Sequence, residues 1–173
     1  MGTCTDSHIV LVGMMGAGKS SVGRMLSRRL DRELLDSDEM IEARTGRTVR
    51  EIWEADGEPA FRVLETEVLR EAVAAPEPSI IAAAGGVVLS ADNREVLKGA
   101  GAHVVWLLAD VDLLLDRVKA GMHRPLLDDD PEGTLRRMYE ERSDLYQEVA
   151  DAIVSVDHRS VKDVAGAVLR CAG

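Results

Sequence analysis

The chain has 173 residues, of which 46% are hydrophobic and only 3% aromatic, and its 21 basic and 31 acidic side chains give a formal net charge of −10. This length predicts one compact domain with an aliphatic core, and the negative charge argues against nucleic acid or an anionic membrane as a partner, because both would repel it. Cys4 and Cys171 lack disulfide or metal-site spacing and no export signal is evident, so we expect a cytoplasmic protein with free thiols.

The first predicted strand, His8–Val12, runs directly into a glycine-rich segment. Residues 13–20 read Gly-Met-Met-Gly-Ala-Gly-Lys-Ser, which is the GxxxxGK(S/T) pattern of a phosphate-binding loop. Glycines allow the bends that aim N–H groups at phosphate oxygens, and the helical pattern after Ser20 places the loop at a helix N-terminus, which favours anions. We expect Lys19 to reach the outer phosphates and Ser20 to meet Mg²⁺. The segment therefore predicts a nucleoside triphosphate ligand.

Further along the chain, apolar runs alternate with helical patterns. The runs predict strands at Glu33–Asp36, Ser79–Ala83, His103–Leu108 and Ala152–Val156. Continuous apolar runs of this kind fit strands buried on both faces of a parallel sheet. The clearest helix follows the last strand, with Ser160 as its N-cap. The alternation predicts a three-layer α/β fold.

Two segments interrupt this alternation. Residues 38–62 carry helical patterning and glycines without an intervening strand, which predicts a helical insertion beside the sheet. Residues 121–131 mix glycine, proline and charged side chains, which is typical of a mobile flap over an active site.

Two carboxylates, Asp36 and Asp38, lie at the end of the second predicted strand. Ligands of open parallel sheets bind beyond the carboxyl ends of the strands, so these carboxylates are candidates to serve Mg²⁺ and to orient an acceptor hydroxyl. The alternative for Asp38 is that it caps the helix that starts at Glu39.

An acidic protein that binds anionic ligands must gather its arginines locally. Arg124 lies in the predicted flap and Arg117 on the helix before it, so both are candidates to neutralise phosphate charge. Arg62 and Arg142 are further candidates, and each has an alternative interpretation. The alternative for Arg62 is a solvated side chain on a helix, and the alternative for Arg142 is an i,i+4 ion-pair partner on a charged helix. The pair Gly85–Gly86 ends the third strand, where the backbone can approach a ligand closely, unless it is an ordinary turn.

In their order and spacing, these motifs resemble those of the shikimate kinases. The matching stretches are residues 13–20, Asp36-Ser37-Asp38, Gly57-Glu58-Pro59-Ala60-Phe61-Arg62, Gly85-Gly86, Arg124-Pro125-Leu126-Leu127, and Arg142 with Leu145-Tyr146. The phosphate-binding loop alone occurs in many NTPases, whereas the combination is highly specific.

The resemblance implies a fold and an activity. The fold is a P-loop kinase domain over residues 1–173, with a five-stranded parallel sheet in the order 2-3-1-4-5, a substrate-binding subdomain at about 38–66 and a lid at about 119–131. The activity is transfer of the γ-phosphoryl group of ATP, with Mg²⁺, to the 3-hydroxyl of shikimate in aromatic amino-acid biosynthesis. The family also implies a monomer.

The resemblance also implies a role for each matching residue. The ATP phosphates would be held by the loop residues Gly16, Ala17, Gly18, Lys19, Ser20 and Ser21 and by Arg117 and the lid residue Arg124, with Arg159 at the adenine. Mg²⁺ would be held by Ser20 and Asp36. Shikimate would be held by Asp38, Arg62, Gly85, Gly86 and Arg142, with Asp38 as base or orienter of the 3-hydroxyl and the two arginines on the carboxylate.

The sequence departs from the family pattern at Ala84, and two other functions are compatible with the phosphate-binding loop. Ala84 stands where the family commonly has a glycine, and a positive φ there would cost an alanine about 1 kcal/mol. The nearest rival function is a kinase of another small molecule, such as gluconate, without the Arg62 and Arg142 carboxylate clamp. The rival from a different class is a non-catalytic module that uses ATP as a switch.

Overall fold

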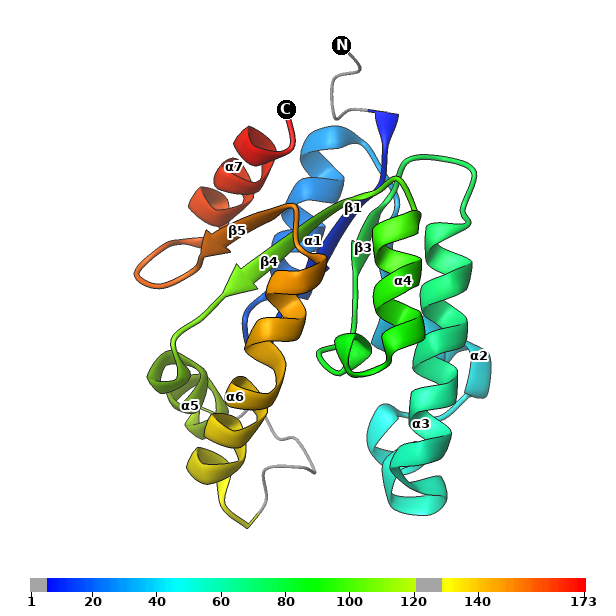
Figure 1. Cartoon of the computed structure of the whole chain (residues 1–173), viewed down its shortest axis with the longest axis vertical. Helices are drawn as coiled ribbons and strands as arrows, with labels where there is room; N and C mark the ends of the chain where they lie inside the picture. The colour runs from blue at the N-terminus through cyan, green and yellow to red at the C-terminus, as the bar shows by residue number, and fades with distance from the viewer. Residues whose placement is uncertain (1–5, 121–128) are drawn as a thin grey trace.

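The computed structural model describes residues 6–120 and 129–173. Five parallel strands form one sheet in the order β2-β3-β1-β4-β5, as the resemblance implies (Figure 1). The strands are β1 (Ile9–Val12), β2 (Leu34–Asp36), β3 (Ile80–Ala82), β4 (His103–Leu108) and β5 (Ala152–Ser155). Each lies within its predicted run, and only terminal residues drop out of the ladder.

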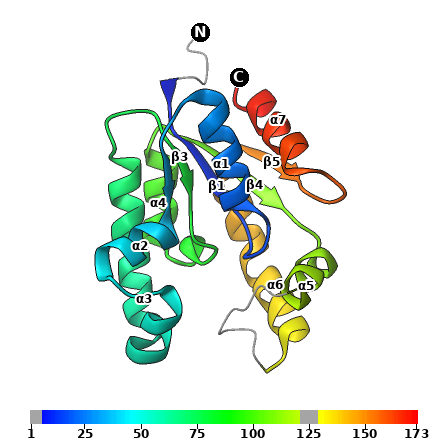
Figure 2. The same cartoon turned by 180° about the vertical axis from the view of Figure 1, so that it is seen from behind.

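Helices cover both faces of this sheet. Figures 1 and 2 show α1 (Lys19–Leu30) and α7 (Val161–Cys171) on one face, and α4 (Ala91–Gly99) and α6 (Pro131–Val149) on the other. The Ser160 hydroxyl accepts the N–H of Asp163 and caps α7, as predicted. The three-layer α/β fold is confirmed.

Burial explains why the strands are continuously apolar. Every residue of β1 and β3 is buried, because both strands lie inside the sheet with helices on each face. At the edge, by contrast, Ile153 of β5 remains 47% exposed. The sheet interior thus forms the rigid base from which the strand-to-helix loops extend.

The segment between β2 and β3 contains helices and no strand, as predicted for residues 38–62. It contains α2 (Ser37–Thr45) and α3 (Val49–Val73), and Thr48 and Glu51 form a capping box at the start of α3. Gly57, with φ 81° and ψ 174°, breaks the helical path within α3. A small cluster of buried side chains holds the two helices together, separately from the main core: Ile41, Ile52, Phe61 and Val68.

The predicted lid lies mostly outside the described residues. The described chain reaches Ala120 after α5 (Val111–Lys119) and resumes at Asp129 before α6, so the Arg124 prediction falls outside it.

A 3₁₀ turn, η2 (Val87–Leu89), follows β3 and precedes α4. Within the described part of the chain, no helix is long and apolar enough to cross a membrane.

Candidate active site

The phosphate-binding loop connects β1 to α1 at the carboxyl end of the sheet. Its backbone depends on glycine at Gly13, where φ is +146° and a Cβ would lie 2.6 Å from the carbonyl oxygen of Leu107. Gly18 precedes α1 as its N-cap and provides no capping side chain. The loop therefore leads into a helix N-terminus whose N–H groups are not capped by the side chain of the preceding residue, a position that favours an anion.

Two cations pack onto this loop. The Lys19 ammonium donates to the carbonyl oxygens of Gly13 at 2.7 Å and Met14 at 3.0 Å. From α5, Nη1 of Arg117 donates to the carbonyl oxygen of Gly16. The structure thus brings Arg117 to the loop, where a charge of the opposite sign to phosphate is needed.

Asp36 links the phosphate-binding loop to the helical insertion. Its Oδ2 accepts a 2.5 Å hydrogen bond from the Ser20 hydroxyl, while its Oδ1 accepts the N–H groups of Asp38 at 3.0 Å and Glu39 at 3.4 Å. Asp36 is therefore the N-cap of α2, and the alternative that Asp38 is the cap is wrong. The reason is that α2 starts at Ser37, directly after β2, which places Asp38 inside the first turn.

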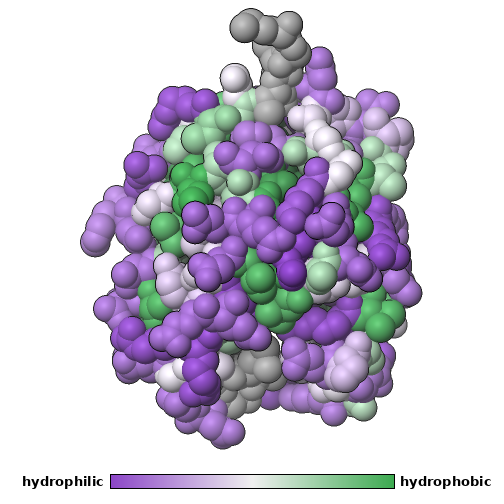
Figure 3. Space-filling model, viewed as in Figure 1, coloured by the Kyte–Doolittle hydropathy of each residue, from purple (hydrophilic) through white to green (hydrophobic). Residues whose placement is uncertain are grey.

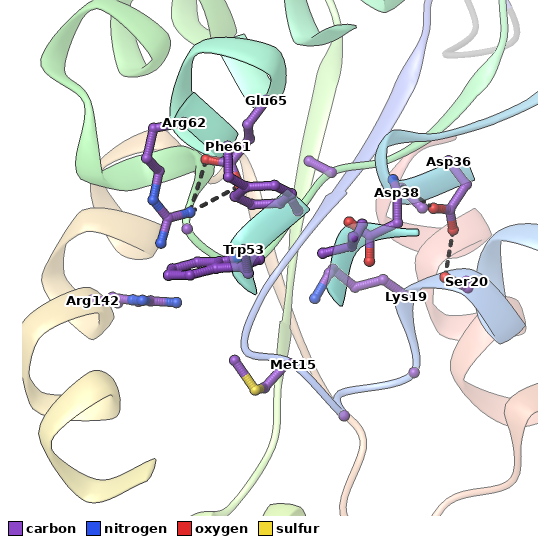
Figure 4. A pocket seen from close by; sticks show the side chains of 18 of the residues that line it. Met15, Lys19, Ser20, Asp36, Asp38, Trp53, Phe61, Arg62, Glu65 and Arg142 are labelled. Atoms are coloured by element: carbon purple, nitrogen blue, oxygen red, sulfur yellow. Dashed lines mark hydrogen bonds and ion pairs between the residues drawn. The ribbon is translucent and has the colours of Figure 1, made fainter. Parts of the chain in front are cut away.

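A cavity of about 310 Å³ opens beside the loop. Figure 4 shows Lys19 and Arg142 reaching into it from opposite sides, with Arg62, Trp53 and Phe61 along one wall. Most of the residues that the sequence assigned to ATP, Mg²⁺ and shikimate line it: Gly16, Gly18, Lys19, Ser20, Ser21, Asp36, Asp38, Arg62, Gly85, Gly86 and Arg142. Ala17 is buried within the loop.

Arg62 is fixed in this wall by two carboxylates. Its Nη1 donates to both carboxylate oxygens of Glu65, at 3.1 and 3.0 Å, and its Nη2 donates to Glu58 at 2.9 Å. The guanidinium carbon also lies 5.8 Å from the Trp53 ring centre and 5.7 Å from that of Phe61. With its side chain only 22% exposed, Arg62 is not the solvated helix arginine of the alternative interpretation.

Glu65 is the buried partner in this arrangement. It is 1% exposed, and burial raises the pKa of its carboxyl group, against the lowering effect of the Arg62 guanidinium. The guanidinium of Arg62 offsets only part of this desolvation, although its Nη1 donates to both carboxylate oxygens.

Arg142 enters the cavity from α6. Its neighbours one turn away, Met138 and Tyr146, cannot form ion pairs, and the residue is only 4% exposed. Its Nε has no hydrogen-bond partner among the described residues. The i,i+4 ion-pair alternative is therefore wrong, and a buried guanidinium in this state calls for an anionic ligand.

The turn after β3 closes the cavity floor without strain. The described non-glycine residues with positive φ are Asp31 and His158, so Ala84 adopts an ordinary backbone conformation and the anticipated cost of alanine does not arise. A Cβ on Gly86 would lie 1.9 Å from Nη1 of Arg62, so glycine at this position allows the close approach of the guanidinium.

Arg159 lies apart from the cavity. It is exposed in the connection between β5 and α7, where its backbone N–H donates to the carbonyl oxygen of Val156 at 3.3 Å. Its role at the adenine stays a prediction, as does the role of Arg124.

Sequence reasoning missed two members of the site. Glu65 lies three residues after Arg62 on α3. This spacing favours an ion pair and was the sequence signal that could have identified Glu65 as the partner of Arg62. Trp53 packs on Phe61 with ring centres 5.5 Å apart. In a chain with so few aromatic side chains, the presence of tryptophan in the insertion was a weak signal of a ligand wall.

The fold and site together define a P-loop kinase that acts on a small acceptor. A family model described as shikimate kinase matches residues 15–172. The shikimate kinase of Symbiobacterium thermophilum is 44% identical over 165 residues, covering 94% of each chain, and that of Burkholderia lata is 43% identical, covering 94% of this chain and 88% of the relative. The chain belongs to the shikimate kinase family.

Solved structures agree with this assignment. The shikimate kinase of Acinetobacter baumannii in complex with shikimate matches with a TM-score of 0.91 and 42% identity, covering 96% of this chain and 92% of that one. A gluconokinase from Sinorhizobium meliloti matches with a TM-score of 0.63 at 19% identity, which shows a shared fold alone.

Proposed function

We propose that the chain transfers the γ-phosphoryl group of ATP to the 3-hydroxyl of shikimate, in aromatic amino-acid biosynthesis. The observation that carries this proposal is the placement of Arg62 and Arg142 in the same 310 Å³ cavity as Lys19. Lys19 suits a triphosphate, and the pair of Arg62 and Arg142 suits the carboxylate of an acceptor. Family membership supports both assignments.

Arg62 and Arg142 would bind the shikimate carboxylate. Both guanidinium groups line the cavity, from α3 and α6, and the planar donor fork of arginine matches a carboxylate. The contacts of Arg62 with Glu58 and Glu65 hold its guanidinium in a fixed orientation before the ligand arrives. Preorganisation of this kind lowers the entropy cost of binding.

Asp38 would contact the acceptor hydroxyl. It lines the cavity between the phosphate-binding loop and the α3 wall, as Figure 4 shows. The transition state of phosphoryl transfer is loose and needs little early proton abstraction, so orienting the hydroxyl is the main task that we assign to this carboxylate. Gly85 and Gly86 would line the ring of the acceptor.

Ser20 and Asp36 would hold Mg²⁺. Their hydroxyl and carboxylate oxygens are already within 2.5 Å of each other, and a hard cation such as Mg²⁺ prefers a small set of protein oxygens together with phosphate oxygens. Mg²⁺ held there would supply positive charge against the phosphate oxygens. In the described residues no cluster of three or more acidic, histidine or cysteine side chains offers another metal site.

Lys19 and Arg117 would neutralise the charge of the transferring group. Both already contact carbonyl oxygens of the loop that would surround the phosphates. Catalysis then rests on positioning and charge neutralisation, without a covalent enzyme intermediate. Arg124 would join them from the lid, and Arg159 would contact the adenine.

An acceptor panel tests the proposal. ADP release should be measured with ATP and Mg²⁺ in the presence of shikimate, of gluconate, or of no acceptor. We expect release to depend on shikimate. Dependence on gluconate instead would favour a different small-molecule kinase, and ATP binding without acceptor-dependent release would favour a regulatory module.

We further propose that the protein acts as a cytoplasmic monomer. The face in Figure 3 is mostly hydrophilic, with apolar side chains in small separate groups, so it offers no broad surface for a partner. Large hydrophobic side chains that are exposed in the described residues are Val63, Ile153 and Val161. Light scattering coupled to size exclusion should give the mass of one chain, and a dimer mass would contradict this.

A further inference from the structure

Tyr146 contacts the floor of the cavity from behind. The residue lies on α6 and is 1% exposed, and its hydroxyl donates a 2.5 Å hydrogen bond to the carbonyl oxygen of Gly85. Its ring packs against Trp106 of β4, with ring centres 5.6 Å apart. The ring thus anchors the side chain in the core, while the hydroxyl donates to the turn after β3 and also makes a side-chain hydrogen bond with Arg142.

The carbonyl groups of this turn are satisfied in different ways. The oxygen of Ala84 accepts the N–H of Val87, and the oxygen of Gly86 accepts the N–H of Leu89, both within the turn itself. The Gly85 oxygen, by contrast, accepts from Tyr146 on another element. This bond therefore ties the turn to α6.

Gly85 is where the two halves of the active site meet. A Cβ placed on it would lie 3.4 Å from both the carbonyl oxygen of Gly13 and the N–H nitrogen of Met15, and 3.7 Å from Nη1 of Arg142. The Gly85 backbone therefore lies between the phosphate-binding loop and the guanidinium of Arg142. A shift of this peptide relative to α6 would change the space in which Arg142 meets its ligand.

Arg142 and Tyr146 lie one turn apart on the same face of α6. From these contacts we infer that Tyr146 is a positioning residue: its hydroxyl holds α6 against the Gly85 turn, and thereby sets the location of Arg142 for the acceptor carboxylate. This inference rests on the proposed function. Burial raises the pKa of Tyr146 to about 12, which keeps the hydroxyl protonated and donating throughout the neutral range.

The test compares Tyr146→Phe with wild type, because phenylalanine keeps the packing on Trp106 and removes only the hydroxyl, with its hydrogen bonds to the Gly85 carbonyl and to Arg142. We expect the KM for shikimate to rise about three- to tenfold, as fits the loss of one neutral hydrogen bond, with the KM for ATP unchanged. Tyr139→Phe is the matched control, since Tyr139 is only partly buried on the same helix. Tyr146→4-aminophenylalanine restores a donor and should recover the shikimate KM.

The outcomes separate the hypotheses. A folded Tyr146→Phe variant with an unchanged shikimate KM would overturn the inference, as would equal changes in the KM values of both substrates or failure of the amino variant to recover a raised KM. If Tyr146→Phe does not fold, the amino variant decides: a shikimate KM near the wild-type value supports the role of the donor, and a raised one overturns it. Absence of shikimate-dependent turnover in wild type would overturn the proposed function and this inference together.

Discussion

The guanidinium of Arg62 occupies the space that any side chain at Gly86 would need. A Cβ there would lie 1.9 Å from Nη1 and 2.5 Å from Cζ of Arg62. Nη1 of Arg62 also donates to both carboxylate oxygens of Glu65, so moving the guanidinium away would break these hydrogen bonds. The acceptor pocket therefore depends on the absence of a side chain at this position.

Gly86→Ala should displace Arg62 and weaken the binding of shikimate. We expect a rise in KM for shikimate of about tenfold or more, because a hydrogen bond to a charged group is worth about 1.5–3 kcal/mol. Steady-state kinetics with varied shikimate measures this. Gly99→Ala is the control, since nothing lies within 4 Å of a Cβ there. An unaltered KM in Gly86→Ala would show that the guanidinium contact does not matter.

Lys19→Ala should abolish turnover. The ammonium group sits on the phosphate-binding loop and would meet the charge that develops on the transferring phosphoryl group. Loss of one such donor lowers kcat by about 10²–10³ or more. Arg28→Ala removes a positive charge from the exposed face of the same helix and should leave kcat unchanged. Near-normal kcat in Lys19→Ala would refute the role assigned to this residue.

Glu65 should make stability depend on pH. Burial raises its pKa in the folded protein above the ordinary value of 4.5, so the folded state binds more protons than the unfolded state at pH values above 4.5. The free energy of unfolding should therefore fall as the pH rises from 4.5 through the folded pKa. Glu65→Gln has no titrating carboxyl group at this position, so its free energy of unfolding should fall less over the same pH window. Urea unfolding of both proteins at several pH values checks this, and parallel curves would contradict it.

The fold could be predicted from the sequence because each strand is a continuous apolar run and each connection carries a helical pattern. The phosphate-binding loop and most pocket residues could also be predicted, because their spacing matches a known family. The three-dimensional environment of single charges could not. Arg62 and Arg142 lie in charged helical segments that resemble solvated surface, and only packing shows Arg142 to be 4% exposed.

The same limit explains why the capping role of the two acidic residues at the junction of β2 and α2, Asp36 and Asp38, could not be assigned from the sequence. A pattern cannot tell whether a helix starts directly after a strand or after a loop residue, so the capping role fell to Asp36 and not to Asp38. The Tyr146 hydroxyl and the Gly85 carbonyl are likewise remote in sequence, and their contact exists only once β3 and α6 pack in one molecule.

The central claim is that Arg62 and Arg142 recognise a carboxylate across the cavity from Lys19. The most direct test is the ratio of kcat/KM for shikimate to that for its neutral carboxamide, in wild type and in Arg62→Met and Arg142→Met. Arg70→Met and Arg137→Met, exposed positions on the same two helices, are the controls. Losing one partner of a buried charge pair costs about 2–5 kcal/mol, so wild type and controls should favour shikimate by about 30-fold or more, and the two site variants should lose most of this preference. Equal rates with the two acceptors in wild type, or a full preference retained in both site variants, would contradict the account.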